Sequence, residues 1–290
     1  MKLKITILAA IIALNASFGN NTLKAQSEYE GTISLSGAFA LYPLAVKWSE
    51  EYKKLHPNVK IDISAGGAGK GMTDALSNLV DIGMVSRDVN GDELKRGAYP
   101  FAVAKDAVVA VVNAQNPAIK DILAKGLKKE AIEGVWITGT NKSWSQVLAT
   151  SVKSPVHVYT RSDACGAGEI WAKFYGKKQE DLLGSGVFGD PGLALAVQKD
   201  PLGIGYNNIG YAYDSKTKKP AKDILIVPLD LNNNGKIDPE ENFYSSLDQI
   251  VEAIADGRYP SPPARELFFV TNGKPKSPAA IAFIKWVLTD

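Results

Sequence analysis

An arginine, an aspartate and two glycines stand together in residues 159–171, between an expected strand and an expected helix. The guanidinium of Arg161 is a planar, permanently charged fork that suits phosphate or carboxylate oxygens. Gly166 and Gly168 fall where the helix should begin, and a helix N-terminus offers unpaired N–H groups and a partial positive charge. Asp163 is close enough in sequence to orient Arg161. The stretch fits half of an oxyanion site, and it equally fits an ordinary strand–helix connection with a surface Arg–Asp pair.

Two further loops with glycine or arginine follow expected strands earlier in the chain. One is the glycine-rich loop Gly66–Gly71, which leads into an expected helix. It lacks the nucleotide P-loop pattern, because Gly71 rather than Ser or Thr follows Lys70. The other begins with Ser86 and Arg87 after a short apolar strand. Ligands of open α/β sheets bind beyond the carboxyl ends of strands, beside helix N-termini, so the loops together favour a site for a small anion.

The elements that would carry these loops alternate between strand and helix, which is typical of α/β folds with mainly parallel sheets. The run 101–113 is almost continuously apolar, as in a strand buried on both faces, and it fits a strand passing between two lobes. With 290 residues, of which 45% are hydrophobic, the chain can form one large domain or two ordinary ones. A net charge of +2 without a Lys/Arg-rich patch argues against a nucleic-acid partner.

Four motifs, in this order, resemble the periplasmic phosphate-binding proteins of phosphate ABC transporters. They are Ser-Gly-Ala-Phe-Ala-Leu-Tyr-Pro-Leu, Gly-Gly-Ala-Gly, Val-Asp-Ile-Gly-Met-Val-Ser-Arg and Arg-Ser-Asp-Ala-Cys-Gly-Ala. The resemblance implies a two-lobed periplasmic-binding-protein fold of type II, in which each lobe is a mixed, mostly parallel sheet flanked by helices. Two hinge strands would join the lobes. The implied bounds are 27–107 plus 263–290 for lobe I and 108–262 for lobe II.

Carried over by position, the resemblance implies phosphate contacts in all of these loops. They are Ala40, Leu41, Gly67, Ala68, Gly69, Ser86, Arg87, Arg161, Cys165, Gly166 and Ala167. The family usually has Ser or Thr hydroxyls where this chain has Ala40, Ala68, Cys165 and Ala167, and each hydrogen bond lost to a charged ligand costs roughly 1.5–3 kcal/mol. Where some members use an Asp to accept the proton of hydrogen phosphate, this chain has Ser86, and Asp88 is the nearest substitute. Sulfate, molybdate and tungstate are therefore alternative ligands.

A second motif is independent of the first. Residues 230–241 follow the EF-hand calcium loop, in which oxygen ligands recur at fixed positions and a glycine makes the sharp turn at position six. The expected ligands are Asp230, Asn232, Asn234, Lys236 through its carbonyl, Asp238 and Glu241. A strand rather than a helix precedes the loop, so the expected calcium ion is structural and pins a turn of lobe II. The alternative is an Asn/Gly-rich turn.

The N-terminus predicts export. Lys2 and Lys4 precede an apolar run too short for a confident membrane span, and a cleavage site is expected near residue 25, so residues 1–25 are interpreted as a signal peptide. The only cysteine is Cys165, so neither an intramolecular disulfide nor a lipid-anchor cysteine is expected. The mature protein is expected to be periplasmic, soluble and monomeric. Family members usually continue beyond the helix that ends near Asp290, so a truncated sequence is also considered.

The predicted function is capture of inorganic phosphate between the lobes by hinge closure, with delivery to the membrane permease of an ABC transporter. A phosphate sensor or adhesion protein that is not coupled to transport is the alternative from another class. Catalysis by Cys165 with His157 is not expected, because Arg161 precedes the cysteine, whereas a phosphate-cleaving cysteine needs an anion loop that runs to a following arginine. No organic cofactor is expected.

Overall fold

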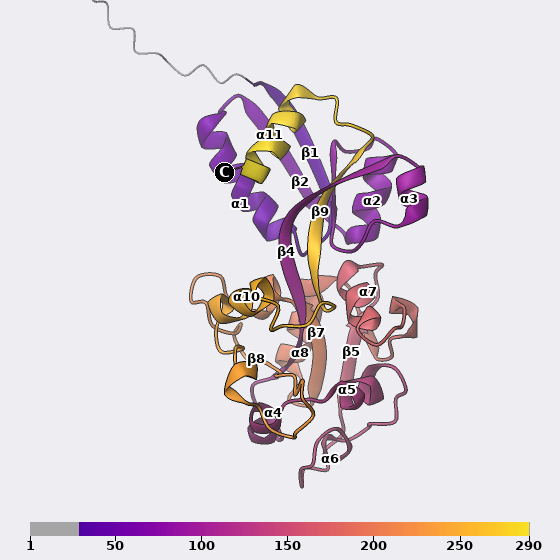
Figure 1. The fold of residues 1–290 in the computed structure, drawn as a ribbon, viewed down its shortest axis with the longest axis vertical. Helices are drawn as coiled ribbons and strands as arrows, with labels where there is room; N and C mark the ends of the chain where they lie inside the picture. Colours follow the sequence, from indigo (N-terminus) through magenta and orange to yellow (C-terminus); the bar gives the residue numbers. More distant parts are fainter. Residues whose placement is uncertain (1–28, 290) are drawn as a thin grey trace, which may run out of the picture.

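The computed structural model describes residues 29–289, which form two lobes joined by two long strands (Figure 1). The expected signal peptide lies outside the described residues. The strands form a nine-stranded sheet in the order β2-β1-β3-β9-β4-β7-β5-β6, with β8 paired to β4. The predicted two-lobed α/β fold is therefore confirmed. Within residues 29–289, no helix combines the length and apolar character needed to cross a bilayer.

Lobe I begins with a parallel arrangement in which β1 lies between β2 and β3. In β2, Val59 and Ile61 are buried while Lys60 and Asp62 are exposed, as the alternation of a half-buried strand requires. The chain later returns to close the lobe with a C-terminal helix (Figure 1). Its elements are β1 (Gly31–Gly37), α1 (Tyr42–Leu55), β2 (Val59–Ala65), α2 (Ala68–Leu76), β3 (Ile82–Val85), α3 (Gly91–Lys95) and α11 (Pro278–Thr289).

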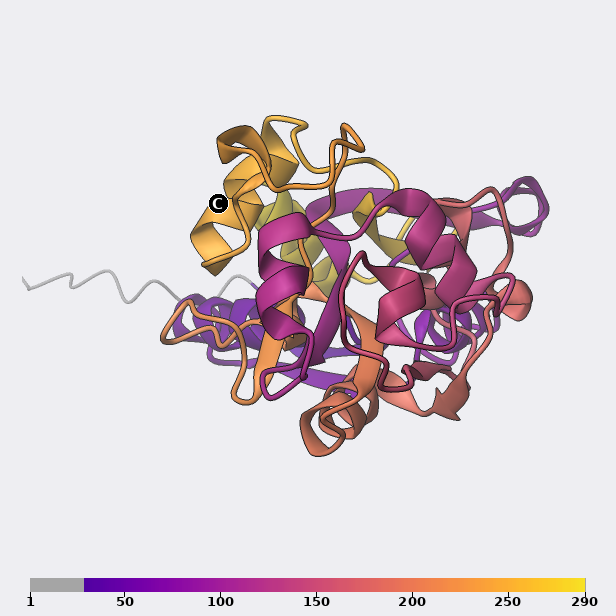
Figure 2. The ribbon, with the colours of Figure 1, turned by 90° about the horizontal axis from the view of Figure 1, so that it is seen from below.

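Lobe II is the segment between the two connecting strands, and helices lie on both sides of its strands (Figure 2). Its helices are α4 (Ile119–Lys125), α5 (Lys129–Trp136), α6 (Trp144–Val147), α7 (Gly166–Lys173), α8 (Gly189–Lys199), α9 (Ile209–Ala212) and α10 (Leu247–Ala255), with 3-10 turns η1 (Gln179–Asp181) and η2 (Pro239–Glu241). Its strands are β5 (His157–Arg161), β6 (Ser185–Val187), β7 (Gly203–Asn208) and β8 (Ile224–Ile226).

The connecting strands are β4 (Ala98–Asn113) and β9 (Ala264–Asn272). The first part of β4 pairs with β9 as far as the partners Ala107 and Ala264, and the rest pairs with β7 and β8. One strand therefore belongs to both lobes, as the apolar run 101–113 predicted. The exact lobe bounds stay predictions.

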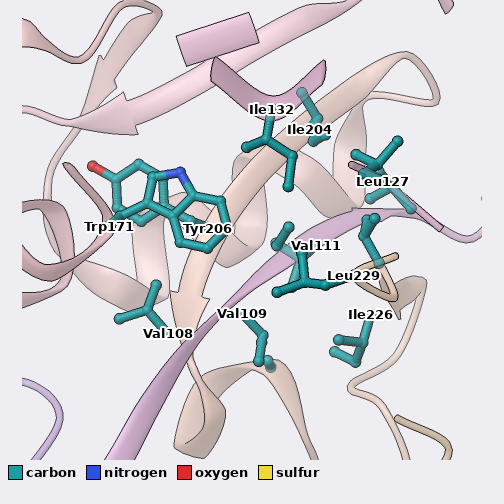
Figure 3. Close-up of a cluster of buried hydrophobic side chains, with 14 of the residues drawn as sticks. Val108, Val109, Val111, Leu127, Ile132, Trp171, Ile204, Tyr206, Ile226 and Leu229 are labelled. Atoms are coloured by element: carbon teal, nitrogen blue, oxygen red, sulfur yellow. The ribbon is translucent and has the colours of Figure 1, made fainter. Parts of the chain in front are cut away.

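The core of lobe II forms around the end of β4. Val108, Val109 and Val111 are at most 1% exposed, because elements pack on both faces of the strand (Figure 3). Trp171 of α7 stacks on Tyr206 of β7 with ring centroids 5.7 Å apart. This stack fixes α7 against the sheet, and so fixes the loop that leads into α7.

Candidate anion site between the lobes

The glycine loops of the two lobes touch one another. A Cβ on Gly166 of lobe II would lie under 3.0 Å from the carbonyl oxygen of Ser86 in lobe I. A Cβ on Gly67 would lie 2.8 Å from the carbonyl oxygen of Ala164. Glycine at these positions therefore permits the two loops to meet, and the structure has the lobes closed on the predicted site.

The first turn of α2 supplies backbone donors from lobe I. Gly67 caps the helix with φ of 91°, and the N–H groups of Gly66 and Gly67 both donate to the carbonyl of Gly37, at 2.9 and 3.0 Å. The N–H groups of Ala68 and Gly69 come next, and no acceptor for them occurs among residues 29–289. They remain available for an anion, and glycine or alanine side chains leave that backbone accessible.

The first turn of α7 supplies matching donors from lobe II. Cys165 is the N-cap, and its Sγ accepts from the N–H of Gly168 at 3.2 Å. The N–H of Cys165 itself donates to Oε1 of Gln179 at 3.0 Å, so it is already used. The N–H groups of Gly166 and Ala167 have no acceptor within the described part of the chain. Of the three residues predicted in this loop, Gly166 and Ala167 therefore have backbone N–H groups available for an anion, and Cys165 does not.

Arg161 is the buried cation of the site. Its side chain is 1% exposed, and Nε and Nη2 donate to the two oxygens of Asp163 at 2.8 and 2.5 Å. Nη1 donates to Asp190 at 2.5 Å. Burial alone would lower the pKa of Arg161, but Asp190 and the other neighbouring acids raise the pKa above its usual value, so the guanidinium stays charged. The geometry agrees with an orienting role for Asp163.

Asp190 is a buried partner of Arg161 that sequence reasoning missed. Its side chain is 2% exposed at the start of α8, and Oδ1 accepts from Nδ2 of Asn208 at 2.5 Å. It lies 29 residues from Arg161 in sequence. Its only local signal in the sequence is an aspartate before Pro191, a pattern that is common at helix starts without any ligand.

Two cationic side chains near these loops, one of them the predicted Arg87, pair with acidic residues. The guanidinium of Arg87 donates to both oxygens of Glu93, at 2.6 and 2.8 Å, and its Nε lies 3.1 Å from a carboxylate oxygen of Glu169 in lobe II. Lys70 pairs with Asp74, four residues on in α2. Ser86 is 3% exposed beside Gly166, and no hydrogen bond of its hydroxyl occurs within residues 29–289. In the loop 86–87, Ser86 is therefore the better placed donor.

The loop of residues 38–41, which leads into α1, also contacts lobe II. Leu41 is buried and its N–H donates to the carbonyl of Ala38 at 3.1 Å, whereas the N–H of Ala40 has no acceptor among residues 29–289. The ring of Phe39 lies 5.4 Å from the Arg161 guanidinium carbon, and its carbonyl accepts from Tyr211 of lobe II at 3.2 Å. This loop therefore contacts lobe II directly and offers one backbone donor.

Cys165 and His157 have separate hydrogen-bond partners in the structure. His157 Nδ1 lies 2.7 Å from Oδ2 of Asp200. Burial raises the pKa of the Cys165 thiol to about 12, despite the opposing effect of Arg161. A neutral thiol at physiological pH is a poor nucleophile, because the thiolate is the reactive form.

The predicted calcium loop forms a compact turn in lobe II. Asp230 and Glu241 are buried, at 2% and 4% exposure, while Gly235 takes φ of 84° at the sharp turn. The side chains of Asn232 and Asn234 both approach Oδ2 of Asp238, with their amide nitrogens at 2.9 and 2.6 Å. The amide oxygens of Asn232 and Asn234 accept from the N–H groups of Asn234 and Lys236, both at 3.0 Å, and a flip of either amide would exchange this bond for an oxygen that faces Asp238. Within residues 29–289, no group of three or more His, Cys, Asp or Glu residues with metal-site geometry occurs.

The fold is that of a two-lobed binding protein, and the uncommitted N–H groups of α2 and α7 lie where its lobes meet. Residues 23–290 match the family model described as a PBP superfamily domain, and the chain belongs to this superfamily. The resemblance drawn from the four motifs is thereby confirmed at the level of the family.

Named relatives agree with this membership. The chain is 30% identical to the phosphate-binding protein PstS of Pseudomonas aeruginosa, over 91% of this chain and 80% of that protein. It is 26% identical to the phosphate-binding protein PstS of Methanocaldococcus jannaschii, over 94% and 82% of the two chains. A crystal structure of a candidate phosphate ABC transporter substrate-binding protein with bound phosphate, from Clostridium perfringens, has the same fold, with a TM-score of 0.72, 22% identity and coverage of 90% and 94%.

Proposed function

We propose that the protein captures inorganic phosphate between its lobes and delivers it to the membrane permease of an ABC transporter. One observation carries the proposal: the loops that begin α2 and α7, each with uncommitted backbone N–H groups, meet across the lobes beside Asp163, the buried partner of Arg161. Such donors suit a small anion stripped of water. The relatives named as phosphate-binding proteins support phosphate as that anion.

Hinge closure is the proposed mechanism. In the open state, the donors of lobe I and lobe II would be separated and hydrated. Phosphate contacts both sets only when the lobes meet, so it favours the closed state by its differential affinity. The interlobe contacts of Phe39 with Tyr211 and of Arg87 with Glu169 form in the same movement.

Titration calorimetry of the mature protein with phosphate, sulfate, molybdate and tungstate tests the ligand. We expect phosphate to bind and Arg161→Ala to lose that binding. Arg258→Ala serves as the control, because Arg258 is exposed and pairs with Asp256. No heat with phosphate but a clear signal from another anion would overturn the phosphate assignment and show that the missing hydroxyls mark a changed specificity.

A test of coupling to a permease distinguishes the transport function from the alternative of a sensor or adhesion protein. The proposal includes export to the periplasm as a soluble monomer, with the signal peptide removed near residue 25. Stimulation of a reconstituted permease by the phosphate-loaded protein is the expected result. Binding of phosphate without any stimulation, using the permease encoded beside this gene, would favour the sensor or adhesion alternative.

We further propose that residues 230–241 hold a structural calcium ion. The convergence of Asn232, Asn234 and Asp238, with buried acids at both ends of the loop, supports it. Calcium at a hundred times its Kd should add about 2.7 kcal/mol to the free energy of unfolding. Glu241→Gln should lose this increase, while Glu240→Gln, its exposed neighbour, should keep it. Thermal unfolding that calcium does not change would contradict the proposal.

A further inference from the structure

Arg265, a buried arginine at the hinge, contacts the backbone of the anion site. Arg265 lies on β9 and is the cross-strand partner of Asp106 on β4, where both strands pass between the lobes (Figure 1). Its side chain is 2% exposed, and Nη2 donates to Oδ2 of Asp106 at 3.0 Å. That ion pair uses only part of a guanidinium that carries five N–H donors.

The first contact with the site is through Gly166. Nη1 of Arg265 donates to the carbonyl oxygen of Gly166 at 3.2 Å. This carbonyl and the N–H of Ala167 belong to one planar peptide unit, so fixing the oxygen fixes the direction of the N–H. The N–H of Ala167 is one of the donors left free for the anion. A cation beside the oxygen also polarises the peptide and strengthens its N–H as a donor.

The second contact reaches Arg161 through two intermediates. Nη2 of Arg265 donates to Oδ1 of Asn208, and this sets the amide so that Nδ2 donates to Asp190 at 2.5 Å. The other oxygen of Asp190 accepts from Arg161 at 2.5 Å. All of these residues are buried, so water does not compete for their hydrogen bonds.

We propose that Arg265 is a positioning residue of the anion site, which orients both the Ala167 N–H and, through Asn208 and Asp190, the Arg161 guanidinium. It does not touch the ligand. A role confined to neutralising Asp106 would account for one of its contacts and leave those to Gly166 and Asn208 unexplained. The inference rests on the proposed function only in taking phosphate as the ligand.

Arg265→Lys tests the proposal. Lysine keeps a positive charge beside Asp106, but a single ammonium on a flexible stem does not reproduce the fork that holds Gly166 and Asn208 together. We expect the Kd for phosphate to rise about tenfold or more. The control is Arg258→Lys, which changes an exposed arginine and should leave the Kd unchanged.

A readout without ligand separates this proposal from the proposed function. In the ligand-free protein, Arg265→Lys should shift the backbone amide resonance of Ala167, and Arg258→Lys should not. An unshifted Ala167 resonance together with a Kd within about twofold of the wild type would overturn the positioning role. If the wild type fails to bind phosphate, the proposed function fails, and the ligand-free resonance still decides the role of Arg265.

A second variant tests the route through Asn208 separately from the route through Gly166. It also replaces Arg265→Lys if that variant does not fold. Asn208→Ser removes the link to Asp190 and Arg161, but it leaves Arg265 beside Gly166 and Asp106. We expect weaker phosphate binding with an unshifted Ala167 resonance. Wild-type affinity in this variant would exclude the route through Asn208.

Discussion

Asp106 is a carboxyl group that the fold makes sensitive to pH. Burial raises its pKa from 3.8 to about 6, although Arg265 opposes the shift. A carboxyl with a raised pKa binds its proton more tightly in the folded state. The free energy of unfolding therefore falls as pH rises from about 4 to about 6, and this loss is fully present above about pH 6. Asp106→Asn removes this titration, so the wild type should lose roughly 2–3 kcal/mol relative to the variant across the window.

Urea denaturation of both proteins at about pH 4 and about pH 7 measures the difference. Asp62→Asn, at an exposed position of β2, is the control for removing an aspartate without removing a buried one. Stability profiles of the wild type and Asp106→Asn that run parallel over this range would show that Asp106 does not titrate with a raised pKa.

Among the charged residues of the site, the partners of some could be predicted from the sequence and the partners of others could not. Asp163 was predicted to orient Arg161 because the two residues are close in sequence, and the ion pair is present. Asp190 and Arg265 come from distant parts of the chain, and only the paired strands bring them to the site. The partner of Arg87 could not be predicted even though Glu93 is near it in sequence, because a guanidinium binds a carboxylate as readily as a phosphate.

Among the elements, α7 begins with a weak N-cap. Its N-cap is Cys165, whose sulfur is a weak acceptor for the N–H of Gly168 at 3.2 Å. Serine is among the preferred N-cap residues. Cys165→Ser should therefore raise the free energy of unfolding by about 0.5–1 kcal/mol and add a hydroxyl beside the anion, whereas Cys165→Ala should lower it by about as much.

Chemical denaturation of the three proteins checks this order, and phosphate titration of the same samples checks the added hydroxyl. A serine variant that is less stable than the alanine variant would mean that packing around the sulfur outweighs the cap. The position of α7 was predictable, since Gly166 and Gly168 follow a strand and precede an apolar helical pattern. The hydrogen bond from the Cys165 N–H to Gln179 could not be predicted, because it depends on how η1 folds back on α7.

For the whole molecule, closure depends on the absence of a side chain at Gly166. A Cβ there would lie under 3.0 Å from backbone and side-chain oxygens of Ser86, across the lobes. The clash arises when the lobes meet, so Gly166→Ala should weaken phosphate binding about tenfold or more with little change in the unfolding of the ligand-free protein. Gly210→Ala, where an added Cβ meets nothing within 4 Å, is the matched control.

Small-angle scattering follows the same variant directly. The wild type should contract when phosphate is added, and Gly166→Ala should contract less at equal saturation. Equal contraction with unchanged affinity would show that Ser86 yields to the added methyl group. The two-lobed shape was accessible from the four motifs and their order, but the closeness of Gly166 to Ser86 depends on the relative placement of the lobes.

The place of β9 in the sheet has a consequence for the order in which the two lobes can fold as the chain is synthesised. β9 lies between β3 and β4, yet it is the last strand to be synthesised. A chain that emerges from its N-terminus can complete lobe II while lobe I still lacks a central strand and leaves an edge of β3 open. The half that is encoded first is therefore expected to be finished last, and a chain truncated before residue 264 should yield a protease-resistant lobe II beside an unassembled lobe I.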